Sequence, residues 1–128
     1  MPGQRVLVVE DEYLIAVNTE DMLTDLGYRV VGPALTLKDG LKAAERGGFD
    51  VALLDVNLTE GTSRPIAEML RERGVPFAYV TGYGSSVSRR NFPPAPSFTK
   101  PINARGLASA LRMLLVPQMS TEKPQGSE

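Results

Sequence analysis

Acidic residues stand at the ends of two apolar segments of the chain. Glu10 closes the segment RVLVVE and is followed by Asp11, and Asp55 closes the segment DVALLD. A buried carboxylate is costly unless a partner compensates its charge. Asp55 ends the most hydrophobic of these segments, so it needs both a compensating partner and a chemical reason to be there.

A hydroxyl and an ammonium group occupy the same kind of position further along the chain. Thr81 closes the apolar segment PFAYVT, and Lys100 directly follows SFT. If these segments are strands of one parallel sheet, their carboxyl ends form the edge where sheets of this kind bind ligands. We therefore expect the acids, the hydroxyl and the ammonium group to meet at one edge.

Three carboxylates at one edge need a cation. Two of them about 4 Å apart repel each other by about 4 kcal/mol at an effective dielectric constant of about 20. Carboxylates are hard oxygen ligands that suit Mg²⁺, and a magnesium ion held by few protein oxygens keeps positions open for a phosphoryl group. Lys100 and Thr81 could bind that group. Asp55 could attack its phosphorus as a nucleophile and form an acyl phosphate.

Each of these residues also has a purely structural interpretation. The acids of residues 10–12 can cap a helix that begins there, Thr81 can be a strand end, and Lys100 can be an ordinary surface lysine. Asn57 can be a turn former. Asp55 is the hardest to explain structurally, because the residues before it must be buried. The occurrence of all of them in this order, at successive strand ends, favours a site.

The elements that position these residues alternate along the chain. Five short apolar segments predict strands at 5–10, 28–32, 50–55, 76–81 and 97–99. The first three are nearly continuous in apolar residues, which is typical of parallel strands buried on both faces. Helical patterns lie between and after them, at 12–26, 36–46, 63–73 and 103–115. The alternation predicts a doubly wound α/β fold.

The ends of the helices carry recognisable signals. Thr36 and Asn103 are expected N-caps, and Pro65 lies in a first turn. In 12–26, five residues are expected to share the buried face of the helix: Ile15, Thr19, Met22, Leu23 and Leu26.

Two segments depart from this pattern. The stretch 82–97 is rich in Gly, Ser and Pro, and only Ser85 to Asn91 could form a short, degraded fourth helix. Residues 117–128 have almost no apolar content and predict a disordered tail. We therefore expect one domain spanning residues 1–116.

Composition excludes several classes of function. The chain has 128 residues, a net charge of -1, no Cys and no His. The charge gives no basic field for nucleic acid or an anionic membrane, and no apolar run approaches the roughly 18 residues that span a bilayer. Without Cys or His, thiolate chemistry and histidine general base catalysis are excluded. A cytoplasmic location is expected.

The motifs VLVVEDE, VALLDVNL, YVTGYG and FTKP together resemble the receiver domain of two-component response regulators. The resemblance runs from Arg5 to Leu115 and implies a flavodoxin-like (βα)5 fold with sheet order 2-1-3-4-5. It implies that Asp55 accepts a phosphoryl group from a sensor histidine kinase, and that Thr81 and Lys100 bind the phosphoryl oxygens. It also implies four ligands for Mg²⁺: the carboxylates of Glu10, Asp11 and Asp55 and the backbone carbonyl of Asn57.

Two departures from the family pattern bear on the output of the domain. Ser97 stands where receivers usually carry a switch aromatic, three residues before the lysine, and the fourth helix is degraded. The TGY of residues 81–83 looks like the single-domain FAT GUY receivers, which are associated with HWE-type kinases. The chain is expected to carry no output domain, and therefore to bind an unknown downstream protein or to drain phosphoryl groups from a kinase as a phosphate sink.

Two rival functions remain open at this point. The segment DVNLT resembles the DxDxT signature of haloacid dehalogenase-type phosphatases, which need an acid two residues after the nucleophile, where this chain has Asn57. An interaction module that works without phosphorylation would be expected to lose site residues, and all of them are present. Neither rival accounts for the whole pattern as well as a receiver does.

The segment between Thr81 and Lys100 is expected to carry the signal. The composition of residues 83–97 predicts that few of them can bury apolar area, so they are expected to open easily. Tyr83 and Asn57 are expected to flank the phosphoryl group and to set its lifetime. The peptide bond between Lys100 and Pro101 is expected to be cis, which would aim Lys100 into the site.

Overall fold

The computed structural model describes residues 3–82 and 92–115. Five parallel strands form the central sheet in the order β2-β1-β3-β6-β7. Their bounds are β1 Arg5–Val9, β2 Arg29–Ala34, β3 Val51–Asp55, β6 Phe77–Thr81 and β7 Ser97–Thr99. Counted along the chain, these five strands have the predicted order 2-1-3-4-5, so the flavodoxin-like fold is confirmed.

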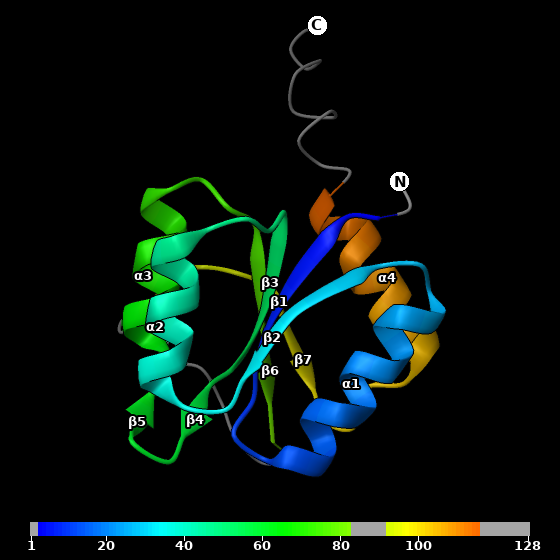
Figure 1. Cartoon of the computed structure of the whole chain (residues 1–128), viewed down its shortest axis with the longest axis horizontal. Helices are drawn as coiled ribbons and strands as arrows, with labels where there is room; N and C mark the ends of the chain where they lie inside the picture. Colours follow the sequence, from blue (N-terminus) through cyan, green and yellow to red (C-terminus); the bar gives the residue numbers. More distant parts are fainter. Residues whose placement is uncertain (1–2, 83–91, 116–128) are drawn as a thin grey trace, which may run out of the picture.

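Helices cover both faces of the sheet (Figure 1). Helices α2 (Leu37–Arg46) and α3 (Arg64–Glu72) lie on one face, and α1 (Tyr13–Asp25) and α4 (Ala104–Leu115) lie on the other. Successive residues of a strand point to opposite faces. Leu7 and Leu54 accordingly pack in the core under α2 and α3. The residues next to them in the same strands, such as Val8 and Leu53, pack in the core under α1 and α4. Burial on both faces explains why β1 and β3 are apolar at nearly every position.

The predicted helix caps are confirmed. The Thr36 hydroxyl accepts a hydrogen bond from the Asp39 N–H at 3.0 Å, and the side-chain oxygen of Asn103 accepts one from the Gly106 N–H at 2.8 Å. Pro65 lies in the first turn of α3. Each cap satisfies a backbone donor that has no partner inside the helix.

Helix α1 packs differently from the prediction. Its buried residues are Ala16 and Leu23, whereas Leu26, expected on the same face as Leu23, is 37% exposed. Ala16 is fully buried, and a pattern built on large apolar residues overlooks it. Strand β2 also runs to Ala34, beyond the expected end at residue 32, and includes a cis Gly32–Pro33 peptide bond.

A short antiparallel hairpin follows β3 and was not expected from the sequence. Its strands are β4 (Asn57–Leu58) and β5 (Gly61–Thr62), and they lie at the same end of the molecule as the carboxyl ends of the parallel strands (Figure 1). The expected helix at 85–91 and the expected tail at 117–128 lie outside the described residues. Within the described part of the chain, no helix is both long and apolar enough to cross a membrane.

Candidate functional site

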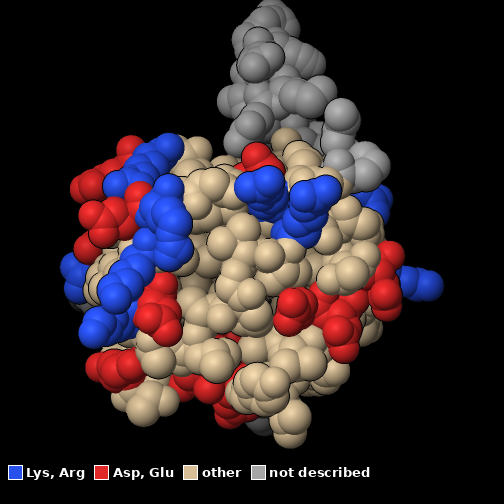
Figure 2. Space-filling view, in the orientation of Figure 1, with Lys and Arg blue, Asp and Glu red and all other residues tan. Residues whose placement is uncertain are grey.

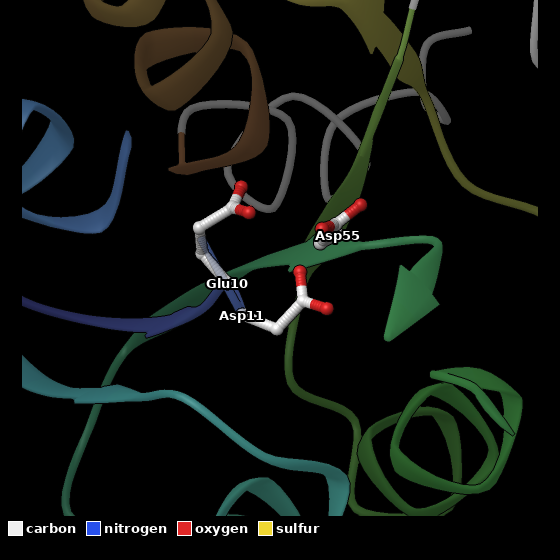
Figure 3. Close-up of side chains that lie close together, drawn as sticks. All are labelled: Glu10, Asp11 and Asp55. Carbon is white, nitrogen blue, oxygen red and sulfur yellow. The ribbon is translucent and has the colours of Figure 1, made fainter. Parts of the chain in front are cut away.

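The carboxyl ends of β1 and β3 bring the three acids together. Leu54 of β3 pairs with Val9 of β1, so Asp55 at the end of one strand lies beside the acids that follow the other. Figure 3 shows the side chains of Glu10, Asp11 and Asp55 gathered between these two strand ends. The convergence of the three acids, which was expected from the sequence, is found in the structure.

The acid cluster has the donor atoms of a magnesium site. One carboxylate oxygen from each acid lies within 4.8 Å of the others. Glu10 and Asp55 are only 4% and 5% exposed, so little water offsets their repulsion. Acidic side chains also lie along the lower edge of the molecular face in Figure 2, where the strands end. Hard oxygen ligands in a negatively charged setting suit Mg²⁺, so the residues present fit that ion.

Lys100 compensates the two buried acids. Its Nζ lies 2.9 Å from Oε1 of Glu10 and 3.2 Å from Oδ2 of Asp55. The sheet fixes the position of Lys100. Its backbone N–H donates a hydrogen bond to the Thr81 carbonyl at 2.7 Å and so continues the pairing of β6 with β7. A single ammonium group shared by two carboxylates explains how Asp55 is tolerated at the end of a buried strand.

Burial and charge shift the protonation of this group. Burial, together with the charge of Glu10, raises the pKa of Asp55 to about 7, although Lys100 acts in the opposite direction. Burial alone would lower the pKa of Lys100, but its hydrogen bond with Glu10 and the charge of Asp55 raise it overall. Lys100 therefore stays protonated at neutral pH, whereas the Asp55 carboxylate is left short of positive charge.

The remaining predicted site residues lie at the same edge. Thr81 is buried at the end of β6 and is joined to Lys100 through the backbone. Asn57 is exposed and opens the hairpin, paired with Thr62. The Lys100–Pro101 peptide bond is cis, as expected from the sequence.

Two side-chain contacts were not foreseen. The Thr59 hydroxyl donates a hydrogen bond to Oδ2 of Asp11 at 2.9 Å, and Oε2 of Glu10 accepts one from the Glu12 N–H at 3.1 Å. The second contact ties Glu10 to the residue before α1. The side chain of that residue, Glu12, makes no capping hydrogen bond to the helix, so the capping interpretation gains little. The turn-forming residues of the segment NLTEGT could have predicted a turn at Thr59, but not its contact with Asp11.

The C-terminal part of the expected mobile segment is packed against the core. Phe92 meets the ring of Tyr79 edge-on, with ring centroids 5.6 Å apart. The Tyr79 hydroxyl donates to the Pro93 carbonyl at 2.7 Å, and Ala95 also packs on the core. The expectation that residues 83–97 bury little apolar area is therefore wrong for residues 92–95. Tyr83 and the rest of residues 83–91 lie outside the described part of the chain.

Known proteins are similar to this chain over most of its length. The response regulator receiver domain matches residues 6–112. The solution structure of SdrG from Sphingomonas melonis Fr1 is similar, with 44% identity, a TM-score of 0.78 and coverage of 89% of this chain and 98% of that one. The receiver domain of the sensor histidine kinase PA1611 from Pseudomonas aeruginosa PAO1, solved with a magnesium ion coordinated in its active site cleft, is 28% identical, with a TM-score of 0.77 and coverage of 88% and 97%.

One curated relative is a longer protein, and this chain is similar to about half of it. The phyllosphere-induced regulator PhyR of Methylorubrum extorquens is 29% identical over 122 residues, which cover 92% of this chain and 46% of PhyR. The chain thus spans about half the length of the curated relatives it matches first. Since the family match covers nearly all of the strands and helices described above, the chain belongs to the response regulator receiver domain family.

Proposed function

We propose that this receiver domain accepts a phosphoryl group on Asp55 from a phosphohistidine of a sensor histidine kinase, in a reaction that depends on Mg²⁺. The observation that carries the proposal is the position of Asp55. It ends a buried strand, lies 3.2 Å from the Lys100 ammonium group and belongs to a cluster of three acids. A purely structural role would not require this surplus of negative charge at a strand end.

The residues that would hold Mg²⁺ are Glu10, Asp11, Asp55 and, through its backbone carbonyl, Asn57. The bound ion would supply the positive charge that the acids lack and that the incoming phosphoryl oxygens need. Support comes from the 4.8 Å cluster and from the magnesium ion in the similar PA1611 receiver domain. The hairpin, which begins at Asn57, would contribute by presenting that carbonyl to the ion.

The chemical step needs an ionised oxygen on Asp55. A carboxylate oxygen of Asp55 forms a bond to phosphorus while the phosphorus–nitrogen bond of the phosphohistidine breaks, and the imidazole leaves. Lys100 already contacts Asp55, so its ammonium group can also bind the oxygens of the transferred phosphoryl group. Thr81 would donate its hydroxyl to another of these oxygens.

We place the partners of this site in a phosphorelay. The donor would be a sensor histidine kinase, and the TGY of residues 81–83 favours one of HWE type. The phosphorylated domain would then bind a downstream protein or act as a phosphate sink. A phosphatase related to the haloacid dehalogenases is not favoured, because the amide of Asn57 cannot transfer the proton which that mechanism requires.

Labelling with a small phosphodonor tests the proposal directly. The chain is incubated with acetyl phosphate, with Mg²⁺ or with EDTA, and its intact mass is measured. We expect one added phosphoryl group with Mg²⁺ and almost none with EDTA. No mass change with Mg²⁺, or an equal gain with EDTA, would contradict the proposal. Steady hydrolysis of a phosphate monoester would instead revive the phosphatase hypothesis.

A further inference from the structure

The three acids of the site are held in two different ways. Glu10 and Asp55 share the Lys100 ammonium group and are buried. Asp11 is only partly buried and has no ion pair in the part of the chain that the structure describes. Its side-chain contact is with Thr59, 48 residues away, whose Oγ1 donates to Oδ2 of Asp11 at 2.9 Å.

The geometry of this contact leaves Asp11 able to bind a cation. An ionised carboxylate has two oxygens that accept only, with about four lone-pair positions between them. The Thr59 hydroxyl uses one position on Oδ2. No other hydrogen bond to this carboxylate is found in residues 3–82 and 92–115, which leaves Oδ1 and the rest of Oδ2 for a cation. A freely rotating carboxylate would lose conformational entropy on binding a metal ion, and a hydrogen bond that already restrains it reduces that loss.

We propose that Thr59 is a positioning residue of the cation site, which holds the Asp11 carboxylate towards Glu10 and Asp55. The proposal rests on the proposed function, because it assumes that these acids bind Mg²⁺. Among the described residues, the Thr59 side chain makes no hydrogen bond to Asp55 or Lys100, so it would act through Asp11.

The hairpin provides a firm support for Thr59. Leu58, the residue before it, is buried in the core under α2 and α3. Glu60, the residue after it, accepts a hydrogen bond from the Leu37 N–H at 3.0 Å through Oε1 and so joins the turn to the start of α2. The pairing of Asn57 with Thr62 closes the hairpin. The hairpin therefore holds Thr59 where its hydroxyl reaches Asp11.

A matched set of hydroxyl variants tests the role of Thr59. Thr59→Val removes the donor and keeps the shape of the side chain, whereas Thr59→Ser keeps the donor. Thr62→Val removes a hydroxyl from β5, the second strand of the hairpin. This side chain is also exposed, and among the described residues its hydroxyl accepts one long hydrogen bond, from the Arg64 N–H at 3.4 Å. The affinity for Mg²⁺ is measured from amide chemical shifts of the full chain during a magnesium chloride titration.

We expect Thr59→Val to weaken Mg²⁺ binding by about tenfold, as is usual when a group that orients a metal ligand is lost. Thr59→Ser and Thr62→Val should bind within about twofold of the wild type. Equal affinity of Thr59→Val and the wild type would overturn the proposal. So would a Thr59→Ser variant as weak as Thr59→Val, or an equal loss in Thr62→Val, because either result would trace the effect to the hairpin and not to the hydroxyl.

Introducing Thr59→Val into an Asp11→Ala chain separates the positioning of Asp11 from a general effect on the structure. If Thr59 acts through Asp11, its replacement by Val should have no further effect in an Asp11→Ala chain. A tenfold loss that persists in that background would overturn the proposal. A wild-type chain that binds no Mg²⁺ would overturn both the cation site and this proposal, whereas wild-type binding with an unaffected Thr59→Val overturns only the role of Thr59.

Discussion

The polar contacts around the acidic edge fall into a buried set and an exposed set. The buried set joins Lys100 to Glu10 and Asp55, and Tyr79 to the Pro93 carbonyl. The exposed set belongs to the hairpin, where Thr59 and Glu60 make their bonds near the surface.

The difference between the two sets lies in what replaces a lost partner. At the surface, water can take the place of a missing donor or acceptor, so an exposed contact orients a group and stabilises little. The buried set has little water around it, so a charge left alone there is costly. The buried set should therefore govern both folding and chemistry, whereas the exposed set should govern affinity alone.

The largest expected effect is on the chemistry of Asp55. Asp55→Asn keeps the size of the side chain and removes the nucleophilic oxygen, so labelling by acetyl phosphate should be abolished. The intact mass should stay at that of the unmodified chain under conditions that label the wild type. Asp25→Asn, at the exposed end of α1, is the matched control and should label normally. Full labelling of Asp55→Asn would remove Asp55 from the mechanism.

The next effect is on stability, through the buried cation. Lys100→Met leaves Glu10 and Asp55 buried without a partner, which should lower the free energy of unfolding by about 3 kcal/mol in metal-free buffer. Urea denaturation followed by circular dichroism measures the change. Lys42→Met removes an exposed lysine from α2 and should change stability by less than about 0.5 kcal/mol. Similar values for both variants would show that the ion pairs of Lys100 contribute little.

Asp11 should separate affinity from stability. Asp11→Ala removes one proposed ligand from the more exposed side of the cluster, so Mg²⁺ binding should weaken by at least about tenfold and labelling should slow. The free energy of unfolding without metal should change by less than about 0.5 kcal/mol, because Asp11 is partly exposed and has no ion pair among the described residues. Unchanged Mg²⁺ affinity would mean that the acidic run serves only the start of α1.

The smallest expected effect comes from the Tyr79 hydroxyl, and it depends on pH. Tyr79→Phe should cost about 1 kcal/mol at neutral pH, because it leaves the buried Pro93 carbonyl without its donor. Burial, with a smaller contribution from Glu68, raises the pKa of Tyr79 from 10.0 to about 12. The unfolded chain therefore loses this proton first.

The sign of the pH effect follows from that order. The contribution of Tyr79 is complete below pH 10 and is lost as the pH rises towards about 12. Urea denaturation of the wild type and of Tyr79→Phe across this pH range should show the two stabilities converging. A constant difference between them would contradict the raised pKa.

The order of the elements and the members of the site could be predicted from the sequence. Strands buried on both faces must be apolar at every position, and the residues that follow them must lie at the carboxyl edge of a parallel sheet. Because these rules are local, the chain order of the acids, Thr81 and Lys100 was enough to bring them together. The caps at Thr36 and Asn103 could be predicted for the same reason, since a cap bonds within its own turn.

Only the tertiary structure decided which atoms meet across long separations. The choice of Glu10 and Asp55 as the partners of Lys100 depends on strand register and burial, and the bond between Thr59 and Asp11 depends on a hairpin of two-residue strands that has almost no periodic signal. The packing of Phe92 on Tyr79 likewise depends on the path of the chain between β6 and β7. Local propensity and periodicity describe neighbours in the chain, whereas these contacts arise between segments that become neighbours only when the sheet and its two layers of helices have formed.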